Sequence, residues 1–458
     1  MKRISIYLMW ISLAVVASSG QTQNTQDQDA QIQQAPVREG TRIPQALGSE
    51  IPPLTTSSEE LYTNVLDLSL QVSALFDDNA LSNNLNKHSD TGYDVQPTIE
   101  FKQELERLQW NFFYSPGFSA NQHFSQRRYF SQIAGTSLTY LLRPHLQLDV
   151  HGRANVTTNP FDQLDHSFSS PHSGLLDQTN TTVILPRYKQ IGEEGGLGLT
   201  WLTSAFTTIS LSGNFSELRY RDIPGVNIQQ LKKLNTRIVN GRATVAHRVS
   251  AKHTLGVLYD YQDLSFPLAH ARTVVHSIQG YDEFSITPSM KLTVFGGPEY
   301  SRVHDQVELS FFFFTFTIPS FTTQWSSAGG AQYDWQGAHS AFRGSFVRKV
   351  SDGGGLIGVV RLYDGRVDFR QRLTRRWTAV LDGDYATNNS LGPVSSSSLH
   401  SYAGSLGIER RISRDLSANL TYSRLHQNIS GTLTGFRVDD DDRVMLSLRY
   451  HWSHPLGR

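Results

Sequence analysis

The sequence of 458 residues contains no cysteine, no long apolar run and no excess of either charge. Without cysteine, the chain can form neither disulfides nor thiolate-metal centres. Lysine plus arginine number 41, and so do aspartate plus glutamate, so no overall field attracts nucleic acid. No segment approaches the roughly 18 consecutive apolar residues of a transmembrane helix. Metalloprotease, hydrolase and nucleotide-binding motifs are absent as well. We therefore expect no enzyme, no cofactor or metal, and no nucleic-acid partner.

Aromatic residues, by contrast, are abundant for so polar a chain. Hydrophobic residues make up only 38% of the sequence, yet it contains 24 Phe, 18 Tyr and 7 Trp. A transmembrane β-barrel combines these two properties, because half of each strand faces a polar interior while aromatic girdles line both membrane interfaces. The composition therefore favours such a barrel over a soluble globular protein.

Apolar and polar residues alternate in segments of about ten residues. The clearest segment places these residues in its apolar phase: Leu108, Trp110, Phe112, Tyr114, Pro116 and Phe118. A period of two indicates a β-strand with one apolar and one polar face. Comparable segments recur from about Leu66 to Trp452. The pattern predicts an all-β fold, a transmembrane antiparallel up-and-down β-barrel. Soluble sandwiches and propellers fit less well, since the strands are long and no blade-length repeat occurs.

Short and long connections alternate between these segments. Tight turns are expected near 104–106, 143–145, 203–205, 248–250, 287–289, 336–338, 374–376 and 411–413. Longer connections are expected near 77–92, 119–128, 158–187, 219–235, 264–271, 303–324, 351–355, 388–398 and 425–442. The sequence therefore predicts about 18 strands, with both chain ends on the side of the short turns.

The N-terminal region differs from the rest of the chain. Residues 1–20 have a charged start, a short apolar stretch and a small-residue cleavage zone, which is typical of a signal peptide and too short for an anchor helix. Residues 21–60 are rich in Gln, Thr, Asp and Pro, which predicts a disordered periplasmic tail. The alternative is a segment that folds into the barrel as a plug. Residues 61–458 are the expected barrel.

In this pattern the chain resembles bacterial outer-membrane porin-like barrels, without a motif of any subfamily. The resemblance implies a Gram-negative outer membrane, both termini in the periplasm, and contact with lipid, lipopolysaccharide and the barrel-assembly machinery. It also implies passive diffusion of small hydrophilic solutes. A non-conducting scaffold, adhesin or polymer-export barrel is the alternative; a barrel hydrolase and a secreted soluble β-protein are weaker ones. One departure is that the terminal aromatic, Trp452, is followed by the tail 453–458.

Charged residues of the polar phase are the candidates for the interior lining. They are Arg242, Arg343, Asp364, Arg366, Asp368, Arg370, Asp382 and Asp384. If Leu373 lies opposite Trp377 across a turn, then Arg366 lies opposite Asp384. Such rows can set the field of a pore. Mutual neutralisation that stiffens the wall is the favoured interpretation, because opposite charges commonly pair across strands.

Two further segments stand out within the expected long connections. The first is an aromatic run, Phe311, Phe312, Phe313, Phe314 and Phe316, which is too apolar to face water. It predicts a constriction loop, although packing on neighbouring loops or an extended strand pair are alternatives, loop packing being favoured. The second is the acidic run 439–442. Its carboxylates can hold a divalent cation, but consecutive residues rarely converge on one ion, so a solvated run is favoured.

Overall fold

The computed structural model describes residues 64–80, 87–124, 128–157, 189–221, 233–311, 314–352, 358–391, 398–430 and 440–456. The expected signal peptide 1–20 and tail 21–60 lie outside the described residues. All the described residues belong to one compact unit, Ile43–Arg458. Within this described part of the chain, no helix has the length and apolarity needed to cross a bilayer.

The described residues form eighteen antiparallel strands. In chain order these are β1 (Asn64–Asp77), β2 (Asp90–Glu104), β3 (Leu108–Asn121), β4 (Arg128–Arg143), β5 (Leu146–Thr157), β6 (Lys189–Leu202), β7 (Thr207–Arg221), β8 (Thr236–Arg248), β9 (His253–Phe266), β10 (Ala271–Thr287), β11 (Met290–Phe311), β12 (Phe314–Gln336), β13 (Ser340–Ser351), β14 (Val360–Arg372), β15 (Trp377–Ser390), β16 (Ser398–Arg411), β17 (Leu416–Ser430) and β18 (Asp440–Pro455). The predicted strand number is therefore confirmed.

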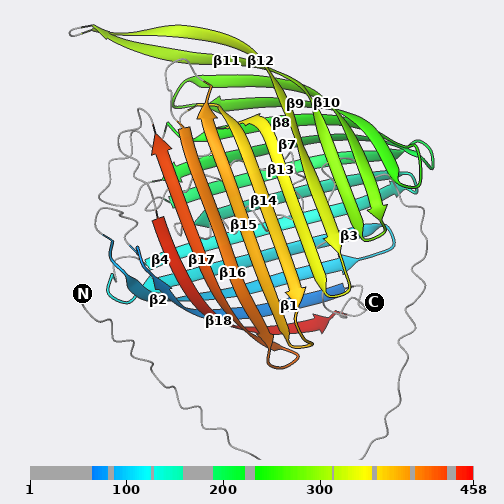
Figure 1. Ribbon diagram of the computed structural model, residues 1–458, viewed down its shortest axis with the longest axis vertical. Helices are drawn as coiled ribbons and strands as arrows, with labels where there is room; N and C mark the ends of the chain where they lie inside the picture. The colour runs from blue at the N-terminus through cyan, green and yellow to red at the C-terminus, as the bar shows by residue number, and fades with distance from the viewer. Residues whose placement is uncertain are drawn as a thin grey trace, which may run out of the picture. The chain divides into compact units, whose positions relative to one another are not determined.

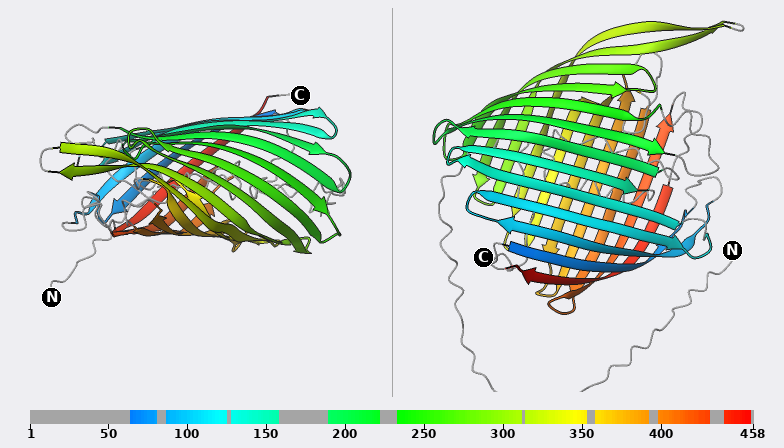
Figure 2. Two further views of the ribbon diagram at one scale, coloured as in Figure 1. Left: turned by 90° about the horizontal axis from the view of Figure 1, so that it is seen from above. Right: turned by 180° about the vertical axis from the view of Figure 1, so that it is seen from behind.

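The strands close into a barrel. Each one pairs with the next along the chain, and β1 pairs with β18 from Val65↔Pro455 to Asp77↔Arg443. Figures 1 and 2 show β13–β18 forming one wall, with their strands running across those of the opposite wall. Closure leaves no edge strand in the barrel, because every strand pairs with a neighbour on each side over at least part of its length.

The eight predicted tight turns all lie between consecutive strands of the barrel. The start of β1 and the end of β18 pair with each other, and they lie at this same end of the barrel, as predicted, because Asn64 lies opposite Gln103 beside the first tight turn. The prediction of a long loop at 303–324 is wrong. Instead, β11 and β12 remain paired from Met290↔Trp335 to Phe311↔Phe314 and form a hairpin that Figure 1 shows projecting past the neighbouring strands.

The outer face of the barrel carries the predicted apolar phase. On β18, Val444, Leu446, Leu448, Tyr450 and Trp452 are all 41–53% exposed. Intervening Ser447, in the other phase, is 2% exposed. Large apolar side chains are stable on an exposed surface only if that surface is covered by an apolar medium. The outer face therefore requires an apolar covering, and the opposite phase points into the barrel.

Candidate functional site: the interior of the barrel

The charged residues predicted for the interior lie on the inward phase of their strands. On β14, Val367 is 40% exposed on the outer face, while Asp364 and Arg366 are both 7% exposed. The cause is the two-residue period of a strand, which sends neighbouring side chains to opposite faces. β14 and β15 thus supply an outer apolar surface and an inner charged one from a single stretch of sequence.

Arg366 is the centre of this inner charge cluster. Its Nη2 lies 2.8 Å from Oδ2 of Asp364, two residues earlier on β14, and its Nε lies 3.2 Å from Oδ2 of Asp384 on β15. The predicted register is confirmed, since Arg366 pairs with Asp384 and Leu373 N donates to Trp377 O. A guanidinium that bridges two buried carboxylates is fixed in position by both contacts, and its removal would leave two buried carboxylates without a counter-charge.

A second charged row crosses the same wall one step closer to the short turns. In register, Arg343 lies between Asp334 of β12 and Asp368 of β14, and Asp368 in turn lies opposite Asp382 of β15. Arg343 Nε donates to Asp334 Oδ1 at 2.8 Å, and Ser405 Oγ donates to Asp382 Oδ2 at 3.0 Å. Sequence reasoning found Arg343 but missed Asp334, although Asp334 shares its phase.

Two further predicted residues differ in their surroundings. Arg370 is exposed on the inward phase of β14, toward the short turns. Arg242 of β8 is 7% exposed and lies beside Asp260 of β9, with 3.0 Å between Arg242 Nη2 and Asp260 Oδ1. Arg242 therefore belongs to a buried ion pair on another part of the wall from the β12–β15 rows.

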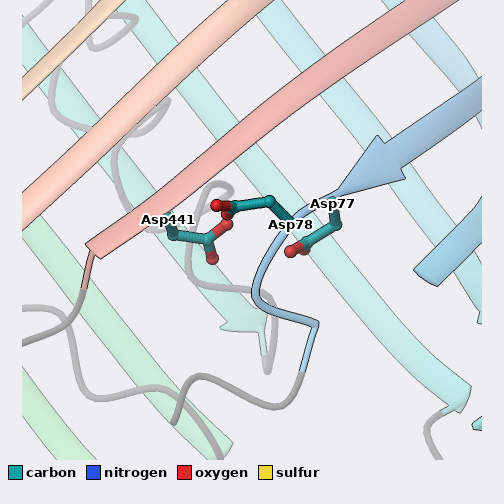
Figure 3. A group of neighbouring side chains, drawn as sticks. All are labelled: Asp77, Asp78 and Asp441. Atoms are coloured by element: carbon teal, nitrogen blue, oxygen red, sulfur yellow. The ribbon is translucent and has the colours of Figure 1, made fainter. Parts of the chain in front are cut away.

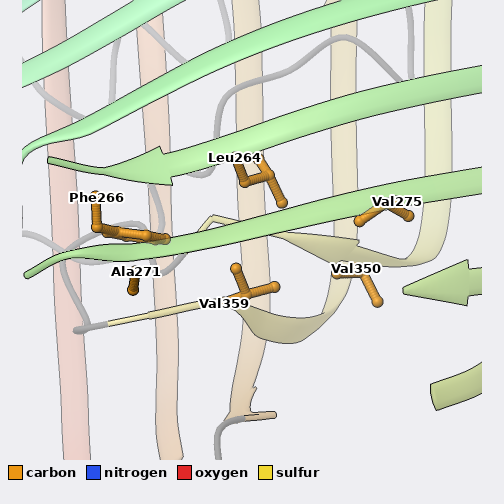
Figure 4. Close-up of a cluster of buried hydrophobic side chains, with 6 residues drawn as sticks. All are labelled: Leu264, Phe266, Ala271, Val275, Val350 and Val359. Atoms are coloured by element: carbon orange, nitrogen blue, oxygen red, sulfur yellow. The ribbon is translucent and has the colours of Figure 1, made fainter. Parts of the chain in front are cut away.

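Sequence reasoning missed an apolar cluster inside the barrel. It consists of Leu264, Phe266, Ala271, Val275, Val350 and Val359, all 9% exposed or less, and joins β9 and β10 to the end of β13 and the start of β14 (Figure 4). A break in the alternation marks only its β9 members, since Leu264 and Phe266 put apolar residues into the polar phase of β9, and does not reveal their partners on β13. This cluster lies near the loop end of these strands.

The end of β13 turns inward to reach this cluster. Its pairing with β12 ends at Arg348, whereas its pairing with β14 continues to Ser351↔Val360. The backbone N–H of Val350 donates instead to Glu299 Oε2 of β11 at 3.0 Å, while Glu299 Oε1 accepts a 2.7 Å hydrogen bond from Ser326 Oγ. Gly358, with φ of +90°, lies just before β14, in a conformation that glycine adopts without steric cost. Glu299 therefore anchors an inward-turned segment of the wall.

The aromatic run lies at the tip of the β11–β12 hairpin. Phe311 ends β11, Phe314 begins β12 and Phe316 pairs with Leu309, while Phe312 and Phe313 lie outside the described residues. The backbone of this hairpin continues the sheet beyond the wall, as in the extended strand pair considered above (Figure 1). The constriction formed by these aromatic residues remains a prediction.

The acidic run near the start of β18 divides between the two faces. Arg424 of β17 binds Asp440 and Asp442, with nitrogen–oxygen distances of 3.1 and 3.0 Å. Asp441, between them, turns inward and is only 3% exposed, and Asp439 lies outside the described residues. The expectation of a solvated run is therefore wrong for Asp441, because the strand's period places it inside the barrel.

A buried carboxylate at the same end orders the connection between β3 and β4. Asp90, the first residue of β2, accepts hydrogen bonds from the backbone N–H groups of His123 and Phe124 at 3.1–3.2 Å, and its Oδ1 lies 2.8 Å from His123 Nδ1. Burial opposes ionisation, but these hydrogen bonds outweigh it and lower the pKa of Asp90 below its ordinary value. Asp90 is therefore held as a carboxylate at the loop end of β2.

Comparisons with known proteins support no family assignment. No family model matches the chain, and no curated protein matches it. Among solved structures, the chain is similar to Pseudomonas aeruginosa OpdQ, with a TM-score of 0.40 and 9% identity over 85% of this chain and 98% of that one. It is also similar to Acinetobacter baumannii OccAB4, with a TM-score of 0.41 and 9% identity over 87% and 100%.

A structure of a different functional class, an import receptor, has a comparable TM-score. The ferric-catecholate import receptor Fiu of E. coli has a TM-score of 0.41 and 8% identity, over 84% of this chain and 81% of that one. TM-scores and sequence identities this low transfer neither a function nor a site from these structures to the chain. The eighteen-strand barrel rests on the strand pairing described above.

Proposed function

We propose that the chain is an outer-membrane channel for the passive diffusion of small hydrophilic solutes. The observation that carries the proposal is the division of faces in a closed eighteen-strand barrel, with large apolar side chains outside and charged rows inside. A barrel of this size is too wide for its side chains alone to fill, so an aqueous path is expected.

The same proposal includes orientation and surroundings. Both termini lie in the periplasm, since short turns occupy the periplasmic side of bacterial barrels. Lipid and lipopolysaccharide cover the outer face, and the barrel-assembly machinery inserts the chain, recognising Tyr450 and Trp452 ahead of the short C-terminal tail. The solutes are small and polar, and the paired interior charges leave only weak selectivity.

Conductance of the purified chain in planar bilayers tests the proposal. We expect discrete steps from protein that shows heat-modifiable gel mobility, which establishes that the barrel is folded. An absence of conductance at any voltage from such folded protein would contradict the channel and favour the non-conducting scaffold.

Asp368→Asn provides a sharper test of the channel. Removing an inward carboxylate should shift the reversal potential in a salt gradient toward the value expected for anions. The control is Leu381→Val, a change on the outer face that should leave the reversal potential unaltered.

A further inference from the structure

Three carboxyl groups from opposite ends of the chain meet at the loop end of the barrel. Asp77 is the last residue of β1, Asp78 follows it, and Asp441 is the second residue of β18. One carboxylate oxygen from each lies within 4.8 Å of the other two (Figure 3). The backbone brings them together, since β1 and β18 form the closing pair of the barrel and Asp78 N donates to Asp442 O at 3.0 Å. The cluster is thus a fixed feature of barrel closure.

Asp441 shows that this cluster is incomplete. It is 3% exposed, and its Oδ1 is buried without a hydrogen-bond partner. Figure 3 shows its carboxyl group directed at Asp78, toward the middle of the group. A buried carboxylate oxygen without a donor loses its hydration and is not compensated by a hydrogen bond, which is costly. A ligand that supplies positive charge at this point would remove that cost.

Two positive groups lie at the edge of the cluster. Arg443 Nη2 donates to Asp77 Oδ2 at 3.1 Å, and Lys87 Nζ lies 3.5 Å from Asp78 Oδ2 at a position where its side chain is 34% exposed. The other Asp77 oxygen accepts from Asn79 N, and Asp78 Oδ1 accepts from Asp442 N. These contacts fix the orientation of both carboxylates, and each oxygen retains a further lone pair.

We propose that Asp77, Asp78 and Asp441 bind one Ca²⁺ ion at the loop end of the barrel. Calcium takes oxygen ligands at about 2.3–2.6 Å, so ligands on opposite sides of the ion are separated by up to roughly 5 Å, which matches this cluster. Magnesium needs about 2.0–2.1 Å and a nearly ideal octahedron, a stricter geometry than carboxylates fixed by the closure of two strands readily provide. Water completes the coordination. The ion joins the first strand to the last and so stabilises the closure of the barrel, independently of whether the barrel conducts.

Calcium binding by the purified full-length barrel in detergent, free of lipopolysaccharide, tests this site. We expect isothermal titration with CaCl₂ to show one saturable site, with Mg²⁺ binding about an order of magnitude more weakly. Calcium should also raise the temperature at which the folded gel band is lost, and a chelator should reverse the shift. If the folded barrel shows no saturable calcium binding, the proposal is overturned. A proton shared among the carboxyl groups would then offset their negative charge. Conductance is not needed for this readout, so its failure is distinguishable from failure of the channel.

Two neighbouring substitutions make the test specific. Asp441→Asn keeps the size of the side chain and removes the charge, and we expect calcium affinity to fall by about tenfold or more. Asp442→Asn changes the adjacent residue, which binds Arg424 away from the cluster, and should leave calcium affinity unchanged. Equal losses in the two variants would indicate diffuse acidic binding and overturn the site. If Asp441→Asn fails to fold, Asp78→Asn, on the more exposed member of the cluster, replaces it with the same expected loss.

Discussion

Leu406 and Ser405 are neighbours on β16 that face opposite media. Leu406 is 57% exposed on the outer surface, whereas Ser405 points inward and donates to Asp382 at 3.0 Å. This pair allows the inside and the outside of the barrel to be distinguished by one residue step, because the side-chain period of a strand is two.

Leu406→Arg should destabilise the barrel in a bilayer, by about 2–4 kcal/mol if the position lies near the midplane, because the charge enters hydrocarbon. Ser405→Arg should be tolerated, since the new cation lies opposite Asp382, its register partner. Urea titrations of the folded gel band in lipid vesicles measure both effects. Equal stability of the two variants would contradict the assignment of faces.

For the buried Arg242–Asp260 pair, we expect removal of one partner to destabilise the barrel more than removal of both. The two side chains are 5% and 6% exposed, so Arg242→Met leaves a carboxylate with no counter-charge in a place that water hardly reaches. We expect a loss of about 3–5 kcal/mol in the free energy of unfolding, most of which the double variant Arg242→Met/Asp260→Leu should restore. Arg372→Met, at an exposed position, is the control and should have little effect. A double variant no more stable than Arg242→Met would show that the pair itself stabilises the barrel.

Much of this architecture follows from sequence periodicity alone. Leu373 opposite Trp377 was enough to place Arg366 against Asp384, because a tight turn fixes the register of both strands. Periodicity could not reveal contacts between strands distant in the sheet. Leu264 and Val350 meet inside the barrel because β13 leaves β12, and Asp441 meets Asp77 only because the barrel closes. The β11–β12 hairpin was misjudged for another reason, as its consecutive Phe residues hide the alternation.

Because Glu299 anchors the end of β13, its loss should lower the stability of the barrel and also disturb the current through the channel. Glu299→Ala leaves the N–H of Val350 without an acceptor at a site where Val350 is 1% exposed, which should cost about 1–3 kcal/mol. The end of β13 should then move more freely, so single-channel current should become noisier than in the wild type. Glu299→Gln keeps one acceptor oxygen and should lie between the two. Current noise unchanged in a folded Glu299→Ala barrel would contradict the anchoring role.

Acid should loosen the β3–β4 connection through Asp90. Because hydrogen bonds lower the pKa of Asp90 in the folded barrel, ionised Asp90 contributes stability that is complete above the ordinary carboxyl value of 3.8. That contribution declines as the pH falls through the lower pKa of the folded state, where protonation removes the acceptor for His123 and Phe124. We expect slow hydrogen exchange at these two amides at neutral pH and faster exchange, relative to strand amides, below pH 3.8. Asp90→Asn should weaken this protection already at neutral pH, and equal protection in variant and wild type there would show that Asp90 does not order the connection.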